Sequence, residues 1–444
     1  MNTEMKMEIK MITNEHENEC EENLIDYYME NIHHDDLYQI IKEIYSLTEK
    51  YLMDDILIIS NPLFHKVLVS EISGFFYSSL LELYPEKATD EFLCDELERI
   101  VENHILFYLR ENKIFLPRSL KEKKEINKTE TFHDIKNKIN QLFESYQPKQ
   151  KTKEWYEYRQ NILTSSNIDK ILGSNARINS LIYEKCKPLS FNEDNENNVN
   201  TDSSLHWGNK YEPVSILIYE EMNSTKISSL GCMTHSTIKH LGASPDGINI
   251  DETNIIKYGR LIEVKNIVNR DIYGIPSETY WVQMQIQMEV CDIDDCDFIE
   301  TRIKEYENKD EFLKEEINKK GIILYFISKH DIGNKPFYVY MPLNILSIHF
   351  DSWIEEKKKI FESDYNLYTI LYWYLDEYSC IYVPRNKIWF QALLPKIQDT
   401  WNIIQNERIH GYNHRMPNQR QKKMECLVID TCSVDLSQDT ISHI

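Results

Sequence analysis

Apolar residues recur at helical spacing along the first part of the chain. From residue 23 to residue 106 they fall three or four positions apart, for example at Ile40 and Ile44, and this spacing lines one face of a helix. The segment 131–146 repeats the pattern after a charged stretch. We therefore predict a helical N-terminal domain over residues 1–145, frayed at its start.

The middle of the chain changes to patterns typical of β-strands. Residues 227–237 and 241–250 predict two strands, and the apolar run that begins at Leu261 predicts a third, buried one. Within the second lies the sequence Ser-Pro-Asp-Gly, at positions 244–247. It predicts a turn, because proline fixes φ and glycine accepts a positive φ. Asp246 is thereby expected at a bend.

The third strand carries an acid and an amine. Glu263 and Lys265 are two positions apart, so both project from one face of the sheet. Paired carboxylates suit Mg²⁺, which takes few protein ligands and keeps several waters, and the ion can activate a water beside a phosphate. With Asp246, the pair suits phosphodiester hydrolysis. The alternative is a plain hairpin with a surface Glu–Lys pair.

The segment 280–291 is ambiguous. Its residues alternate strictly between apolar and polar, which by period 2 predicts a half-buried strand. Glutamine and methionine, however, are good helix formers, and in a helix Gln283 and Gln287 would share a face.

A possible anion site comes earlier in the chain. Thr164-Ser-Ser166 is a helix N-cap cluster, and backbone amides, a serine hydroxyl and the guanidinium of Arg159 could together bind a phosphate. The alternative is an ordinary cap with a surface arginine. The segment 192–204, rich in Asn, Asp and Glu, predicts a loop.

Composition indicates a globular protein whose net charge is unfavourable for binding nucleic acid. The chain has 444 residues, 41% hydrophobic and 28% charged, and a net charge of −23. This charge opposes general binding to nucleic acid, so a DNA ligand would require a local basic groove. Two basic clusters are candidates, at Lys149, Lys151, Lys153 and Arg159, and between Arg408 and Lys423. The alternative for each is a solvated face or tail, and for the second cluster this alternative is favoured.

The chain shows no sequence feature of export or membrane insertion. No apolar run approaches the length of a membrane span, the N-terminus lacks the order of a signal peptide, and the nine cysteines form no CxxC pair. We expect a soluble protein that stays inside the cell in which it is made.

Five blocks, in order, resemble the phage lambda exonuclease branch of the PD-(D/E)XK nucleases, the YqaJ-type viral recombinases. They are Trp155 to Arg159 with Thr164 to Ser166, Trp207 to Pro213, Asp246 within Ser-Pro-Asp-Gly, Glu263-Val-Lys265, and Tyr280 to Met288. The resemblance implies a restriction-endonuclease-like α/β core at residues 146–365, a mixed sheet flanked by helices in the order α-β-β-β-α-β. It also implies that 280–291 is a helix. Residues 366–444 would be a C-terminal extension with a disordered end.

The resemblance also implies the site. Asp246, Glu263 and the Val264 carbonyl would hold Mg²⁺ or Mn²⁺, and Glu212 would bind a second metal or its waters. Lys265 would position or activate water, and Gln283 and Gln285 are the expected catalytic amides. The 5′-phosphate of a DNA end would be held by the N-terminal block, namely Arg159, Ser165 and Ser166 with Trp155.

By this resemblance the chain would be a 5′-to-3′ exonuclease of linear double-stranded DNA, serving viral recombination, replication or repair. Its partners would be DNA ends, a single-strand annealing protein recruited by the N-terminal domain, and further copies of itself in a ring around DNA. An endonuclease or RNase on the same core, and a non-catalytic DNA-binding scaffold, are the alternatives.

Overall fold

The computed structural model describes residues 34–83, 91–111, 117–121, 131–148, 152–189, 201, 203–316, 319–330 and 335–417. The expectations for the N-terminal end, for most of the loop at 192–204 and for the tail beyond residue 423 lie outside these ranges. Among the described residues, no helix is both long and apolar enough to cross a bilayer.

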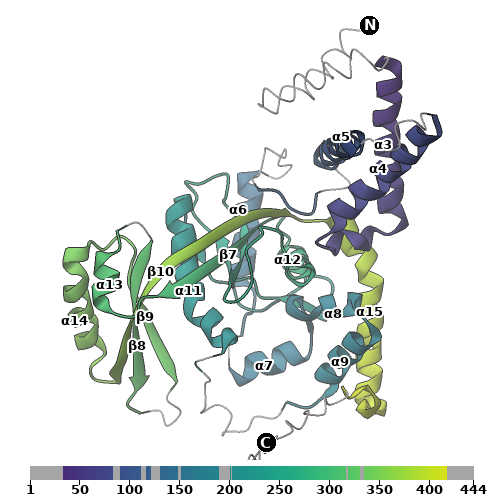
Figure 1. Ribbon diagram of the computed structural model, residues 1–444. Helices are drawn as coiled ribbons and strands as arrows, with labels where there is room; N and C mark the ends of the chain where they lie inside the picture. The colour runs from purple at the N-terminus through teal and green to yellow at the C-terminus, as the bar shows by residue number, and fades with distance from the viewer. Residues whose placement is uncertain are drawn as a thin grey trace, which may run out of the picture.

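The N-terminal part is helical, as its pattern predicts. Figure 1 shows these helices at the upper right, beyond one end of the sheet. They are α3 (His34–Asp54), η1 (Ile56–Ser60), α4 (Phe64–Leu83) and α5 (Glu91–Glu111), followed by α6 (Phe132–Glu144) against the core. Arg118 joins the two parts, because its Nη2 donates to Ser60 O over 3.1 Å while its carbonyl accepts from Trp281 Nε1 over 2.7 Å.

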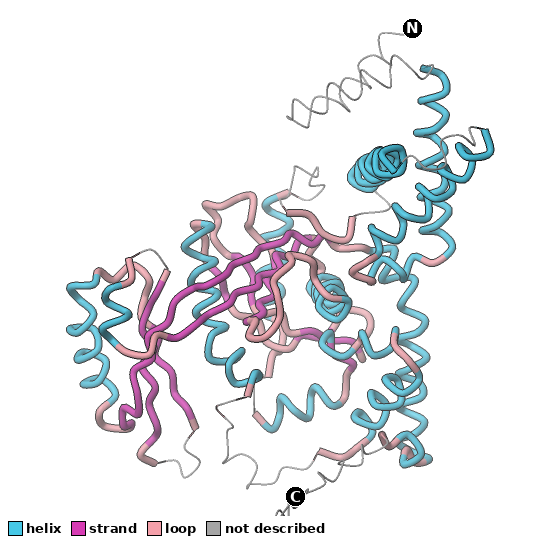
Figure 2. The backbone as a smooth tube through the Cα atoms, in the orientation of Figure 1, coloured by secondary structure: helices cyan, strands magenta, loops and turns pink. Residues whose placement is uncertain are grey.

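A seven-stranded mixed sheet forms the centre of the molecule (Figure 2). Its strand order is β2-β5-β6-β7-β10-β8-β9, and only β6 and β7 are parallel. The strands are β2 (Ile227–Ser228), β5 (Gly247–Asn249), β6 (Leu261–Asn266), β7 (Asp295–Glu305), β8 (Lys320–Ser328), β9 (Pro336–Tyr340) and β10 (Tyr365–Pro384).

The predicted strands at 227–237 and 241–250 each break in two. The second half of the first segment is β3 (Met233–Thr234), and the first half of the second segment is β4 (Leu241–Ala243). Together with β1 (Leu163–Thr164) they form a small sheet, in which β1 and β3 flank β4. The break in 241–250 falls at Ser-Pro-Asp, because proline has no N–H for a ladder and its ring restricts the residue before it. The two sheets therefore meet at Asp246.

The extension expected from residue 366 begins instead inside the sheet. The 20-residue strand β10 lies between β7 and β8 and pairs with both. Together with β8, β9, α13 (Lys309–Lys314), η4 (Ser347–His349) and α14 (Phe350–Phe361) it makes the lobe at the left of Figure 1. The boundary at 365/366 thus differs from the structure, since the strand completes the sheet started by the core.

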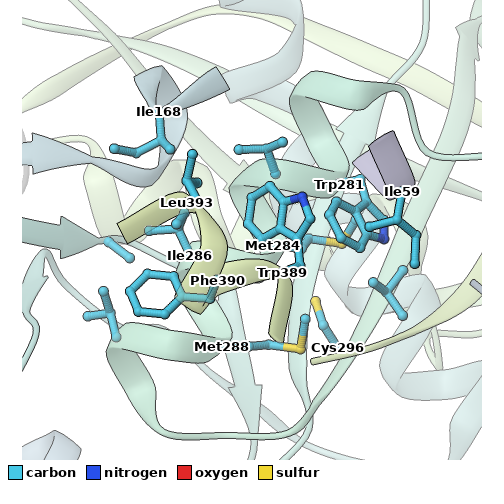
Figure 3. Close-up of a cluster of buried hydrophobic side chains, with 14 of the residues drawn as sticks. Ile59, Ile168, Trp281, Met284, Ile286, Met288, Cys296, Trp389, Phe390 and Leu393 are labelled. Carbon is cyan, nitrogen blue, oxygen red and sulfur yellow. The ribbon is translucent and has the colours of Figure 1, made fainter. Parts of the chain in front are cut away.

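The segment 280–291 is a helix, α12 (Glu278–Cys291), as the resemblance implies. It is buried on nearly every side, because the sheet covers one face and α15 (Lys387–His410) packs on another. Figure 3 shows the contact: Met284, Ile286 and Met288 lie among Trp389, Phe390 and Leu393, and Trp281 meets Trp389 edge to face at 4.9 Å. Burial all round explains why its apolar pattern lacks helical period.

The remaining helices are α7 (Lys153–Gln160), η3 (Ser165–Asn167), α8 (Asp169–Leu172), α9 (Asn175–Cys186), α11 (Ser204–Asn223) and η5 (Asn413–Arg415). Of these, α11 covers a face of the seven-stranded sheet, and the others lie around the small sheet and α15. In Figure 1, α15 runs down the right-hand side beside α8 and α9.

Candidate active site

Asp246 lies at the predicted bend, half-buried, between β4 and β5. Its Oδ2 accepts a hydrogen bond of 2.7 Å from the Val264 amide on β6. Gly247 does not have a positive φ, so the reason expected for this glycine is wrong. It is instead a close approach, since a Cβ there would lie 2.3 Å from Ile227 Cγ2 on β2.

Glu263 and Lys265 project from one face of β6, as period 2 predicts. Ile262 and Val264 on the opposite face pack against Tyr219 of α11. Glu263 is fully buried, and its Oε1 pairs with the Lys265 ammonium. The strand therefore buries its apolar face under α11 and turns an ion pair toward α12.

Two glutamines of α12 hold Glu263 in place. Gln283 Nε2 donates to Glu263 Oε1 and Gln287 Nε2 to Glu263 Oε2, each over 2.7 Å. Gln287 also donates to Ser244 O over 3.3 Å. Both carboxylate oxygens of a buried acid are thus bound by neutral amides and one ammonium.

Gln285 does not reach this cluster, which corrects the prediction for it. Its Nε2 donates to Pro384 O over 2.9 Å and its Oε1 accepts from Asn386 N over 2.7 Å. It points toward the start of α15, because in a helix positions 283 and 287 share a face and position 285 lies on the opposite one. The predicted catalytic residues did not include Gln287, which binds Glu263. Its spacing of four positions from Gln283 could have indicated that the two side chains share a face.

The carboxylates of the cluster repel one another. Burial and the neighbouring Glu263 and Glu212 carboxylates raise the pKa of Asp246 well above its ordinary value, against smaller opposing effects of Lys265 and the Val264 amide. Burial lowers the pKa of Lys265, but the attraction of Glu263 and Asp246 outweighs it and leaves that pKa raised. The carboxylates attract additional positive charge.

Glu212 acts on this cluster through its charge. It sits in the first half of α11, half-buried, and its charge acts on both Asp246 and Tyr340 of β9. Tyr340 in turn donates to Lys210 O over 2.8 Å. The acid is therefore on the α11 side of Asp246.

The donors present fit a hard divalent cation such as Mg²⁺ or Mn²⁺. Asp246 and Glu263 supply carboxylate oxygens. The Val264 amide faces Asp246, and its carbonyl faces the same side, because N–H and C=O of one strand residue point together. Within the described ranges no three His, Cys, Asp or Glu side chains gather tightly enough to count as a metal site by themselves. Mg²⁺ needs only one or two carboxylates and keeps its waters, so the fit holds.

A second cluster surrounds Arg159, at the end of α7. Its Nη2 lies 3.3 Å from Ser166 Oγ and 3.5 Å from Thr164 Oγ1, and its guanidinium stacks over the Trp155 ring at 4.6 Å. Trp155 thus supports the arginine from one side.

The arginine faces an open cavity of about 460 Å³. The cavity is lined by both polar and charged groups, chiefly Arg159, Thr164, Ser166, Lys170, Lys185 and Lys187. Ser165, by contrast, is buried and lies outside this lining. Trp155 also lies outside it, so the structure places Arg159 and Ser166, and not all four predicted residues, on the cavity.

The segments that lead to the cavity and to the acidic cluster follow two paired strands. Strands β1 and β4 are parallel, with Thr164 opposite Gly242. The chain therefore leaves both strands at the same end, toward Ser166 from β1 and toward Asp246 from β4.

Comparison with known proteins identifies the central region. Residues 154–294 match the model of the YqaJ-like viral recombinase domain, and this range contains every site residue predicted above. An uncharacterized protein of Acanthamoeba polyphaga mimivirus is 26% identical in an alignment 327 residues long, which covers 65% of this chain and 58% of that protein. The match thus spans little more than half of the relative's length.

Two solved structures share weaker likeness. An alkaline exonuclease from Laribacter hongkongensis is 16% identical, covering 58% of this chain and 95% of its own, with a TM-score of 0.35. A phage-related exonuclease from Haemophilus somnus is 14% identical, covering 56% and 93%, with a TM-score of 0.28. These TM-scores are too low to establish a shared fold.

Proposed function

From the premise that residues 154–294 form a YqaJ-like viral recombinase domain, we propose that this chain is a metal-dependent nuclease, and specifically a 5′-to-3′ exonuclease of linear double-stranded DNA. One observation carries the proposal: Ser166 of the cavity and Asp246 of the acidic cluster follow β1 and β4 at the same end of these two parallel strands. A site that holds a terminal phosphate next to a phosphodiester-cleaving centre favours removal of nucleotides from an end.

The protein's own residues have defined parts in the reaction. Asp246, Glu263 and the Val264 carbonyl would hold the divalent cation, with Glu212 available to its waters; the cation supplies an acidified water and neutralises phosphate charge. Gln283 and Gln287 orient Glu263 over 2.7 Å hydrogen bonds. Lys265, paired with Glu263, would orient the attacking water or donate to phosphate oxygens as their charge grows.

The terminal 5′-phosphate of the substrate would lie in the cavity. Arg159 offers a planar fork of donors that matches a phosphate, and the Ser166 hydroxyl 3.3 Å away adds a further donor. Trp155 stacks beneath the guanidinium and restricts its position. This arrangement favours a 5′-phosphorylated end over a 5′-hydroxyl.

The test is digestion of linear duplex DNA, with and without a 5′-phosphate, in Mg²⁺. We expect nucleotides to be released from the native chain, a loss of roughly 100-fold or more in rate in Lys265→Ala, and loss of the 5′-phosphate preference in Arg159→Ala. Lys239→Ala, which changes an exposed lysine before β4, is the matched control and should retain native rates.

Other substrates separate the alternatives. Circular duplex and RNA should remain intact with the native chain. Cleavage of circles or RNA at rates equal to linear DNA would replace the exonuclease with an endonuclease or RNase, and binding without cleavage of any substrate would leave a scaffold protein.

A further inference from the structure

Lys185 is a buried cation on the cavity that the reaction described above does not use. It lies near the end of α9, is 4% exposed, and lines the cavity with Arg159 and Ser166. Its Nζ donates to the carbonyl oxygen of Arg159 over 2.8 Å. An ammonium has three donor hydrogens, and in the part of the chain that the structure describes this is its one hydrogen bond.

One carboxylate acts on this charge, but it pairs with another cation. Glu184, the neighbouring acid, also lines the cavity, and its carboxylate binds Lys170 over 2.7 Å. The other charges that act on Lys185 are Arg159 from α7 and Arg408 from α15, both positive, and Cys232 from the segment before β3 is the remaining titratable group. A buried ammonium that has no ion pair of its own among the described residues is costly, so its surroundings favour binding of an anion.

The position of Lys185 is fixed by its backbone. Its carbonyl accepts from Gln160 Nε2 over 2.9 Å and from Arg408 Nη2 over 2.8 Å. The end of α7, the end of α9 and α15 therefore meet around this residue, and its ammonium is held there by its bond to the Arg159 carbonyl.

We propose that Lys185 is a specificity-determining residue, which binds the dianionic terminal phosphate monoester of a DNA 5′ end together with Arg159. The proposal rests on the proposed function and deepens it. Arg159 alone would accept any phosphate, including the diesters of the backbone. A second, buried cation favours the terminal monoester, which carries about one more negative charge than a diester at neutral pH.

Binding affinities of 5′-phosphorylated and 5′-hydroxyl duplex ends, measured in EDTA, test the proposal without cleavage. In Lys185→Met we expect the affinity for the phosphorylated end to fall roughly 10- to 100-fold, the value of a charged hydrogen bond, with that for the hydroxyl end unchanged. Lys239→Met is the control at an exposed lysine. Thermal unfolding of each variant verifies that it is folded.

The pH dependence of DNA binding distinguishes an effect of the Lys185 charge from an effect of its packing. Burial, helped by Arg159 and Arg408 and opposed by Glu184 and Cys232, lowers the pKa of Lys185 to about 8. The native preference for the phosphorylated end should therefore decline as pH rises above about 8, since the phosphate itself stays dianionic there. In Lys185→Arg, whose guanidinium does not titrate, the preference should persist.

The outcomes separate this proposal from the one it rests on. Two results would overturn the role of Lys185 and leave the nuclease proposal standing. One is a preference for phosphorylated ends that survives in Lys185→Met, and the other is a folded Lys185→Arg variant that loses this preference at high pH. A native chain with no preference for phosphorylated ends and no cleavage of DNA overturns the nuclease proposal too.

Discussion

The glutamines of α12 have different roles, which depend on the face of the helix that each occupies. Gln283 and Gln287 reach Glu263, whereas Gln285, between them in sequence, reaches the backbone of Pro384 and Asn386. Three chemically identical side chains within five positions therefore divide into two that orient an acid and one that joins α12 to α15.

Substituting these glutamines should separate the residue that orients a metal ligand from the residue that only joins two helices. We expect Gln287→Ala to lower the cleavage rate per folded molecule by roughly 10- to 100-fold, the usual loss when a group that orients a metal ligand is removed, and Gln285→Ala to leave that rate unchanged. Each substitution should cost about 1–3 kcal/mol of unfolding free energy, because each leaves buried groups unpaired. Rates per folded molecule and urea unfolding measure both; equal rate losses in the two variants would contradict this division.

The charge of Asp246 should couple cation binding to pH. Its pKa is raised by burial, Glu263 and Glu212, so the metal-free folded state holds a proton that the unfolded chain releases. The resulting stabilisation is present below the unfolded pKa of about 4 and is lost as pH rises through the folded pKa. A divalent cation binds the ionised form. Mg²⁺ should thus raise the thermal midpoint more at about pH 8 than at about pH 5.

Asp246→Asn removes this titration. We expect its metal-free midpoint to exceed the native one at neutral pH by about 2 °C, the shift for a gain somewhat under 1 kcal/mol, and Mg²⁺ to add nothing at any pH. Asp310→Asn, at an exposed position on α13, should behave as the native chain does. A Mg²⁺-induced shift that persists in Asp246→Asn would remove this residue from the cation site.

Among whole elements, β10 depends on close contact with β8. Trp373 lies opposite Gly321 in the ladder, and a Cβ at position 321 would fall 2.6 Å from its ring. The ring is rigid and Trp373 is buried. We expect Gly321→Ala to destabilise the fold by about 1–3 kcal/mol through overpacking.

The matched control is Gly74→Ala in α4. That glycine is exposed and a Cβ there meets nothing within 4 Å, so alanine should stabilise the helix by about 0.5–1 kcal/mol. Urea unfolding of both variants measures the difference, and an unchanged midpoint in Gly321→Ala would show that β8 and β10 can separate at no cost.

Local pattern predicted what depends on neighbours in sequence. The bend at Asp246 and the common face of Glu263 and Lys265 follow from proline chemistry and period 2. The helix at 280–291 required the family resemblance, since an element buried all round loses its amphipathic period.

Long-range pairing was beyond local pattern. Strand β10 takes its place from β7 and β8, both far earlier in the chain, so a Tyr- and Trp-rich segment gave no indication of its partners. Lys185 is similar: nothing in its surroundings in sequence predicts burial, because the groups that fix it, Gln160 and Arg408, come from other elements.

At the scale of the whole molecule, the far C-terminal helix supports the cavity near the start of the YqaJ-like domain. Arg408 of α15 donates to Gln160 O over 2.7 Å and to Lys185 O over 2.8 Å. Part of the basic run between Arg408 and Lys423 is thus engaged within the protein, while Arg420, Lys422 and Lys423 lie outside the described ranges. A chain of net charge −23 can still bind DNA if its cations are gathered at one cavity.

Removing that support should weaken recognition of the DNA end without altering the chemistry. In Arg408→Ala we expect a stability loss of about 2 kcal/mol from the lost charged hydrogen bonds. The KM for 5′-phosphorylated duplex should rise roughly tenfold at an unchanged kcat, because binding of the terminal phosphate is weakened equally in the ground state and the transition state. Arg415→Ala is the control: it breaks contacts with Glu407 and Asn179 near the same helix end and should lose stability while keeping the native KM. If both variants raise KM equally, the effect is general loosening of α15, and the cavity does not depend on Arg408 in particular.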